Sequence, residues 1–151
     1  MRLLPFLTSA SRPIIGAMFL FLIITSCAPP VSQYSDSAYR QAVELKVVSL
    51  DLIEHATQPF GAYDDEVRAL RLELEKAYEF SKGRPDNEFS TQQWAIMIDP
   101  ERNMLGGFLR RWEERGSMPE VFVNEARQNI ADGFDTIIDL ESGKIEPGDL
   151  P

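Results

Sequence analysis

The sequence predicts an all-α domain over residues 36–143, folded as a small antiparallel bundle of four helices, or of five if the third is divided. Apolar residues in this range recur every three or four positions, which is the spacing of one face of a helix. No segment alternates apolar and polar residues with the period of two that marks a half-buried strand. Proline or glycine separates each helical segment from the next, and short connections favour antiparallel neighbours.

The first two helices are predicted over residues 36–57 and 63–82. Pro59 ends the first helix because it moves the residue before it out of helical geometry. Acidic residues in the first turn favour the start of the second helix, and Gly83 is placed to cap its end. The apolar positions of the first helix are Tyr39, Val43, Val47, Leu50 and Ile53, with Ala42 and Leu45 widening the stripe. Those of the second are Val67, Leu70, Leu74 and Ala77, and Ser81 continues their spacing.

The third segment is predicted to begin with a capping box, in which the side chains of Ser90 and Gln93 satisfy free backbone N–H groups. Phe89 and Trp94 stand at the two positions of a hydrophobic staple and are predicted to pack together. Asp99 and Pro100 then interrupt the pattern. We expect Asp99 to act as a fresh N-cap with Pro100 in the first turn of a further helical piece, which continues to Gly116. A break at this point gives the bundle its fifth helix.

The last helix is predicted to open at a second capping box, Ser117 with Glu120 around Pro119, and to end at Gly143. Residues 144–151 contain a Pro-Gly pair and are predicted to form a flexible C-terminal tail. The apolar positions of this helix are Phe122, Ala126, Ile130, Phe134, Ile137 and Ile138.

Residues 1–26 have the layout of a secretory signal peptide. Arg2 and Arg12 precede an apolar run over residues 13–24. The small residues Thr25 and Ser26 then come directly before Cys27. A membrane-spanning helix needs about 20 apolar residues, which is more than this run supplies, so we expect cleavage rather than a permanent span. Residues 27–35 are polar and contain proline, and they are predicted to form a tether to the helical domain.

Residues 24–27, Ile-Thr-Ser-Cys, resemble the lipobox of bacterial lipoproteins: an aliphatic residue, a small or hydroxyl residue, Gly, Ala or Ser, and then Cys. The resemblance covers residues 1–27 only. It implies cleavage between Ser26 and Cys27, lipidation of Cys27, and attachment to a lipid bilayer through the acyl chains. Because Ala28 stands where an Asp would retain a lipoprotein at the inner membrane, the resemblance also implies the periplasmic face of the outer membrane, or the cell membrane in an organism with one membrane.

Two plainer interpretations of Cys27 are a small residue beside a conventional cleavage site and a free buried thiol. Cys27 is the only cysteine of the chain, so it has no internal disulfide partner. An unpaired thiol is a liability in an oxidising compartment, and lipidation removes it. These considerations favour the lipid anchor.

The net charge argues against one class of partner. The whole chain carries a formal charge of −9; without Arg2 and Arg12 of the signal, thirteen basic residues stand against twenty-four acidic ones, a charge of −11. Such a surface repels phosphate backbones and anionic lipid headgroups. We therefore expect no nucleic-acid partner, and we expect membrane attachment to be covalent or apolar.

No residue pattern indicates a catalytic, cofactor or metal site, so we expect a protein that is not an enzyme. His55 is the only histidine and follows Asp51 by one helical turn, but a zinc enzyme needs three protein ligands. A histidine at the end of a helix is more simply explained by interaction with the terminal carbonyl groups. The acidic residues of the last helix are expected to form a solvated face: Glu125, Asp132, Asp135 and Asp139.

Gly106 and Gly107 are the most unusual feature of the helical region, because each glycine inside a helix costs about 1 kcal/mol relative to alanine. Such conflicts mark a kink, a close helix contact or a functional spot. Arg110, Arg111 and Trp112 follow directly, and guanidinium groups bind carboxylates or glycans well. The leading hypothesis is an envelope-protein partner that docks around these five residues.

Alternatives to this hypothesis remain open. Arg110 with Glu114 is also an ordinary exposed helix pair, and the aromatic residues nearby are most simply core. The rival function is binding of a small apolar or anionic ligand between helices, with Trp94, Phe108 and Trp112 lining the pocket. A more distant alternative is an enzyme that acts on the cell wall.

Overall fold

The computed structural model describes residues 34–145 and 148, so residues 1–26, Cys27 and all but the last two residues of the predicted tether lie outside it. The part of the chain that it describes forms five α-helices and two short 3-10 helices, without a strand. The predicted all-α fold is confirmed, with five helices because the third segment is divided. The α-helices are α2 (Asp36–Glu54), α3 (Asp64–Lys82), α4 (Glu88–Ile98), α5 (Leu105–Arg115) and α6 (Glu120–Ser142).

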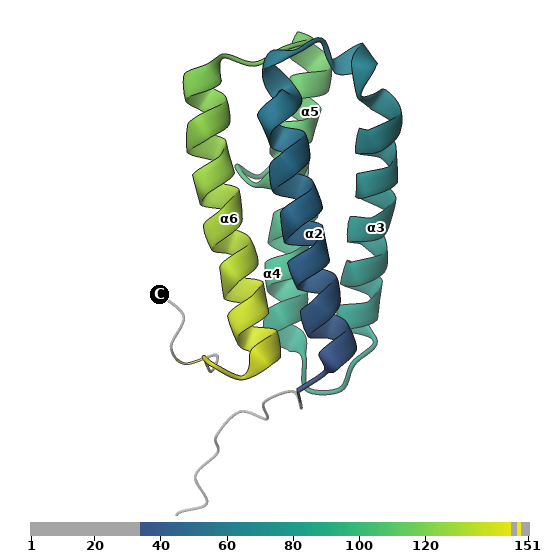
Figure 1. Ribbon diagram of the computed structural model, residues 1–151. Helices are drawn as coiled ribbons and strands as arrows, with labels where there is room; N and C mark the ends of the chain where they lie inside the picture. Colours follow the sequence, from purple (N-terminus) through teal and green to yellow (C-terminus); the bar gives the residue numbers. More distant parts are fainter. Residues whose placement is uncertain (1–33, 146–147, 149–151) are drawn as a thin grey trace, which may run out of the picture.

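The helices pack as a bundle in which α4 and α5 follow one another along a single column (Figure 1). α2 packs against both α3 and α6, and α4 packs against α3 and α6. Neighbouring columns run in opposite directions, and the 3-10 helices His55–Thr57 and Phe60–Ala62 connect α2 to α3. The start of α2 and the end of α6 therefore lie at the same end of the bundle.

The first helix begins as predicted, and its buried face is centred on Ala42, Leu45 and Ile53 of the predicted stripe, with Val47 outside it. The Ser35 hydroxyl accepts a hydrogen bond from the backbone N–H of Ala38 at 3.3 Å and caps α2. Val47, predicted to face the core, is 63% exposed, whereas Ser49 is fully buried. α2 packs against both α3 and α6. Its buried residues are Ala38, Ala42, Leu45, Ser49, Leu52 and Ile53.

The predicted start of the third segment is wrong. α4 begins at Glu88, and Ser90 is a buried residue within the helix rather than its cap. Asn87 occupies the N-cap position but makes no capping hydrogen bond, because its side-chain amide instead donates to the backbone oxygen of Ser81 at 3.1 Å. Phe89, predicted to pack against Trp94, is 38% exposed. A tertiary contact has replaced the local capping motif.

Asp99 divides α4 from α5, although not in the predicted manner. Asp99 ends α4, and its carboxylate accepts a hydrogen bond from the backbone N–H of Glu101 at 2.8 Å in the turn that follows. α5 begins only at Leu105, so Pro100 lies in the connection and not in the first turn of a helix. The predicted division is correct, and the predicted role of Asp99 as an N-cap is wrong.

The second predicted capping box is also wrong. α6 begins at Glu120 after Pro119, and no side chain caps it. The backbone before it is held by the 3-10 helix that follows α2: Met118 N–H donates to the Ala56 oxygen at 2.8 Å. Here a contact between segments far apart in sequence holds the backbone at the start of the helix. At the other end, Gly143 adopts a left-handed conformation, with φ of 71°, and caps α6 as predicted.

Of the predicted tail, residues 144, 145 and 148 are described. Lys144 folds back on the end of α6: its backbone N–H donates to the Asp139 oxygen at 3.0 Å. Its ammonium group pairs with the Asp139 carboxylate at 3.1 Å. Lys144 is therefore part of the helix terminus rather than of a free tail.

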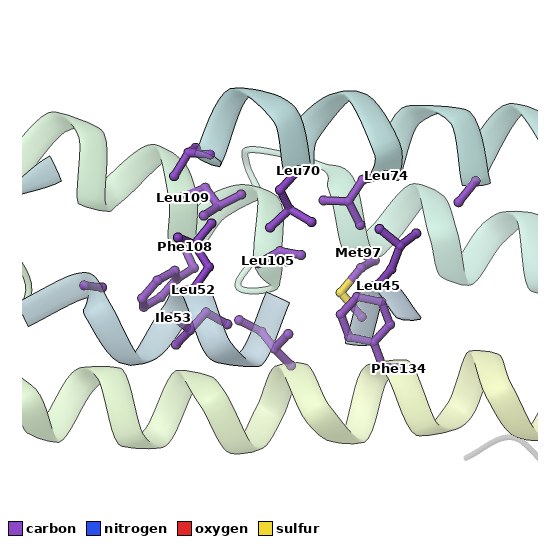
Figure 2. Close-up of a cluster of buried hydrophobic side chains, with 14 of the residues drawn as sticks. Leu45, Leu52, Ile53, Leu70, Leu74, Met97, Leu105, Phe108, Leu109 and Phe134 are labelled. Carbon is purple, nitrogen blue, oxygen red and sulfur yellow. The ribbon is translucent and has the colours of Figure 1, made fainter. Parts of the chain in front are cut away.

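Apolar side chains from all five α-helices fill the centre of the bundle (Figure 2). Trp112, Phe108 and Phe134 are the largest fully buried side chains. Burial of a large apolar side chain contributes roughly 1.5–3 kcal/mol, so this centre supplies the main driving force for folding. The four apolar positions predicted for α3 are all among the buried residues.

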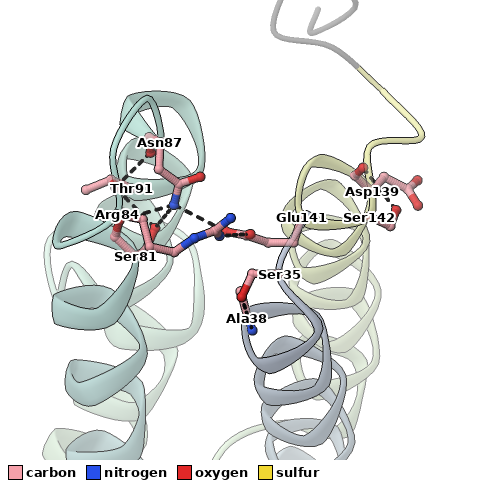
Figure 3. Close-up of polar contacts among 9 residues, drawn as sticks. All are labelled: Ser35, Ala38, Ser81, Arg84, Asn87, Thr91, Asp139, Glu141 and Ser142. Atoms are coloured by element: carbon pink, nitrogen blue, oxygen red, sulfur yellow. Dashed lines mark hydrogen bonds and ion pairs between the residues drawn. The ribbon is translucent and has the colours of Figure 1, made fainter. Parts of the chain in front are cut away.

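A buried polar cluster ties α6 to the connection between α3 and α4 (Figure 3). The Glu141 side chain, only 1% exposed, forms an ion pair with Arg84, whose side chain is 13% exposed. Asn87 donates to the Ser81 hydroxyl at 2.8 Å and lies 3.4 Å from Glu141. This cluster holds the end of the bundle where α2 begins, and the sequence did not predict it.

Candidate functional site

The predicted lipidation site, Cys27 with cleavage after Ser26, lies outside the described residues and stays a prediction. Within the described part of the chain, no helix is long and apolar enough to cross a bilayer. The other predicted site residues, from Gly106 to Trp112, lie in the described helical bundle.

Gly106 and Gly107 allow the backbone of α5 to approach the connection that precedes it. A Cβ atom on Gly106 would overlap the carbonyl oxygen of Ile98, and one on Gly107 would overlap that of Arg102. No larger residue fits at either position without movement of the backbone. Of the three explanations that the sequence left open, a close backbone contact accounts for both glycines.

Arg110 is largely occupied by groups of its own chain. Its Nε donates to the Pro100 oxygen at 2.9 Å, and a terminal nitrogen pairs with Glu114 at 3.0 Å. A further contact, at 3.7 Å, joins it to Glu101. The ordinary helix pair with Glu114 is confirmed, and a partner carboxylate would have to compete with these contacts.

Arg111 and Trp112 are also held within the domain. Arg111 donates to the Asn103 side-chain oxygen at 3.2 Å, and its guanidinium lies 5.5 Å from the ring centre of Phe122. Trp112 is fully buried, and its indole N–H donates to the Gln58 oxygen at 3.1 Å. Trp112 therefore presents no surface to a partner in this conformation, which corrects its place among the predicted contact residues.

Gly106 and Arg110 do reach a groove between α3 and the junction of α4 with α5, which we call the α5 groove. Its volume is about 410 Å³, and its apolar lining includes Leu74, Ile98 and Leu109. Its second cation, Arg71, pairs with Glu113 at 2.8 Å. The five predicted docking residues are thus not one surface, because Gly107 and Trp112 are buried.

The aromatic residues predicted to line a ligand pocket pack against other rings. Trp94 meets Phe134 edge-on with ring centres 6.0 Å apart. Phe108 stacks on Phe122 at 6.1 Å, and Trp112 meets Phe60 edge-on at 5.5 Å. All three predicted residues belong to the hydrophobic core. The structure brings these rings into the interior of the bundle, where side chains rather than a ligand contact them.

His55 stacks on Tyr63, with ring centres 4.9 Å apart and planes within 13°. Its Nδ1 lies 3.4 Å from the Gln58 amide nitrogen, so the ring is held at the turn after α2. Groups of three or more His, Cys, Asp or Glu side chains arranged to hold a metal ion do not occur among the described residues. The contacts of His55 are those of a residue that packs two helix ends together.

Two of the four acidic residues predicted to form a solvated face on α6 take part in ion pairs. Asp135 pairs with Lys46 of α2 at 2.5 Å, and Asp139 pairs with Lys144. The hydrogen bond from Lys144 to Asp139 raises the pKa of the lysine, as the bond from Lys82 to Glu79 does for that residue. These lysines are exposed partners of carboxylates, which is a structural arrangement rather than a catalytic one.

A second groove, which the sequence did not predict, lies between α2 and α3. We call it the α2–α3 groove. Its volume is about 370 Å³, and the buried side chains of Leu45 and Leu70 line it. Val48, 48% exposed, and the exposed Ala69 complete its apolar surface. Because Ala69 has only a methyl group, the space beside it stays open.

Three glutamates line the same groove: Glu44 from α2, and Glu66 and Glu73 from α3. Glu73 pairs with Lys76 at 2.6 Å. Glu44 and Glu66 form no ion pair with another residue of the described part of the chain. The α2–α3 groove therefore combines exposed apolar surface with uncompensated negative charge. The sequence shows that each helix carries exposed apolar residues and glutamates. It does not show that α2 and α3 bring them together in one groove.

Comparison with known proteins adds no relationship: no protein-family model, curated protein or solved structure matches this chain.

Proposed function

We propose that the chain is a bacterial lipoprotein whose helical bundle is a non-catalytic, protein-binding domain. Residues 24–27 support attachment through acylated Cys27, and Ala28 supports the periplasmic face of the outer membrane, or the cell membrane of an organism with a single membrane. The observation that carries the binding role is the α2–α3 groove, where apolar side chains and unpaired carboxylates remain exposed on a well-packed domain. Exposed apolar patches rimmed by polar groups are typical of protein-binding surfaces.

The position of the proposed anchor is compatible with this role. α2 begins at Asp36, the ninth residue after Cys27, so a lipid at Cys27 would hold the bundle by the end at which α2 starts. With 19 residues at about 1.5 Å each, α2 extends roughly 28 Å from that end. The long sides of the bundle, where both grooves lie, would then face other proteins rather than the bilayer.

The anchor is tested by the mass of the protein purified from a bacterial envelope. The natural chain is expected to begin at Cys27 and to carry acyl chains, whereas Cys27→Ser is expected to stay uncleaved and unacylated. Ser26→Ala is the matched control, because alanine is an accepted residue at that position of a lipobox. Acylation that survives Cys27→Ser, or natural protein with a bare thiol, would contradict the lipoprotein assignment.

The binding role is tested by native mass spectrometry of the lipidated protein after gentle detergent extraction. A protein retained in stoichiometric amount is the expected result. A retained small molecule without a protein would support the ligand-binding alternative instead. Exchange of both Arg110 and Arg111 for alanine examines the docking position predicted from the sequence: loss of the retained protein would place it on α5, and full retention would exclude that position.

A further inference from the structure

We propose that the α2–α3 groove binds a basic amphipathic helix of a partner protein, an inference that rests on the protein-binding function above. An apolar side chain of that helix lies between Val48 and Ala69, and its lysine or arginine side chains pair with Glu44 and Glu66.

The dimensions of the groove match one face of a helix. Its lining runs from Gln41 to Val48 on α2 and from Glu66 to Glu73 on α3, which is two helical turns on each. A helix laid along the groove presents side chains at intervals of three, four and seven residues over the same length. The exposed surfaces of Val48 and Ala69 supply the apolar contact that such a helix buries.

The charge of the groove selects a basic partner. Glu44 and Glu66 are exposed and lack an ion pair with a described residue, so cations on a docked helix would not need to displace any existing partner. Glu73 is shared with Lys76 and contributes less. The strongly negative chain as a whole also attracts a basic segment from a distance, while it repels an acidic one.

The charges of the α5 groove do not favour a basic partner in the same way. Its lining has one carboxylate, Glu75, beside two cations, whereas the α2–α3 groove has three carboxylates and no cation. The two cations, Arg71 and Arg110, pair with Glu113 and Glu114, so a docked anion would have to break an existing contact. This contrast places the partner on α2–α3 rather than on α5.

The probe is a synthetic amphipathic helix of about 18 residues, with leucines along one face and lysines on both sides of it. Its counterpart carries glutamate in place of every lysine. Binding is measured by fluorescence anisotropy with the lipidated full-length protein in a non-ionic detergent, against detergent micelles alone. We expect the lysine peptide to bind and the glutamate peptide not to bind. A benzophenone on the leucine face is expected to cross-link to residues 41–48 or 66–73.

Two variants remove the features on which the proposal depends. Glu44→Lys with Glu66→Lys is expected to weaken binding of the lysine peptide at least tenfold, and Glu125→Lys with Asp132→Lys is the control, with the same change of net charge on α6. Ala69→Leu fills the groove and is expected to abolish cross-linking without loss of helical structure. Gln128→Leu, which adds a leucine to an exposed site on α6, is its control and should bind as the natural protein does.

Several results would overturn the proposal: equal binding of the two peptides, equal weakening by the α2–α3 and α6 charge variants, cross-links outside the groove, or unchanged binding by Ala69→Leu. None of these affects the wider function, because a protein retained in native mass spectra would still show a protein-binding domain. If native mass spectra show no retained protein, the protein-binding function is contradicted. The peptide measurements do not depend on that result, so the two failures can be told apart.

Discussion

The segment from Gly106 to Trp112 and the α2–α3 groove differ in what remains available to a partner. In the first, two glycines are required by a close backbone contact, Arg110 and Arg111 bind groups of their own chain, and Trp112 is buried. In the groove, Val48 and Ala69 are exposed and two glutamates lack an ion pair among the described residues. The unusual sequence from Gly106 to Trp112 is therefore explained by contacts within the fold. The two ordinary amphipathic helices α2 and α3, in contrast, leave apolar and charged side chains available to a partner.

The largest expected effect tests whether the glycines of α5 are structural. Gly107→Ala should lower the free energy of unfolding by about 3 kcal/mol or more, because the added Cβ overlaps a backbone oxygen that has little room to move. Gly61→Ala is the control, since a Cβ at Gly61 meets no atom within 4 Å. Urea denaturation followed by circular dichroism measures both. Equal stability of the two variants would show that Gly107 is free to serve another role.

The next effect compares a buried glutamate with the exposed ones of the groove. Glu141→Ala should cost about 2–3 kcal/mol of unfolding free energy, because it removes one side of a buried ion pair, the carboxylate that Arg84 contacts. Glu141→Gln retains hydrogen-bonding atoms and should cost less. Thermal denaturation at neutral pH ranks the variants, with Glu44→Ala as the exposed control. A smaller loss of stability in Glu141→Ala than in Glu44→Ala would show that the buried pair does not stabilise the fold.

A smaller effect is expected for Arg111, whose contacts the structure assigns to the fold. Arg111→Ala should destabilise the domain by about 1 kcal/mol through loss of the contact with the Phe122 ring and the hydrogen bond to Asn103. Arg115→Ala, an exposed arginine at the end of the same helix, is the control. Chemical denaturation measures both variants. If Arg111→Ala is as stable as the control and also loses a bound partner, the predicted binding role of this arginine would be restored.

The smallest effect on stability is expected in the groove itself. Glu44→Gln with Glu66→Gln should change the free energy of unfolding by less than about 0.5 kcal/mol, because neither carboxylate has a described partner to lose. The same pair should weaken the lysine peptide severalfold. Denaturation and anisotropy on one protein preparation give both numbers. A marked loss of stability would mean that these glutamates serve the fold and not a partner.

Much of the fold was predictable because it depends on local spacing. The period of apolar residues located all the helices, Gly143 marked the end of α6, and Asp99 marked the division of the third segment. Ser90 and Ser117 match the capping-box motif, but contacts with other helices set both helix starts elsewhere. Asn87 bonds to Ser81 at the end of α3 and lies 3.4 Å from Glu141 of α6, and Met118 bonds to Ala56. The candidate site was less predictable, since exposure of Val48 and burial of Trp112 depend on neighbouring helices.

The sequence by itself determined the helical class, the approximate helix ranges and the expectation of an exported, lipid-anchored chain, because these follow from residues close together along the chain. Only the tertiary structure decided which face of α2 is buried, why Gly106 and Gly107 lie against the connection before α5, and that Glu44 and Glu66 share one groove. The physical reason is that burial and charge pairing depend on which helices become neighbours, and helical spacing alone does not specify that choice.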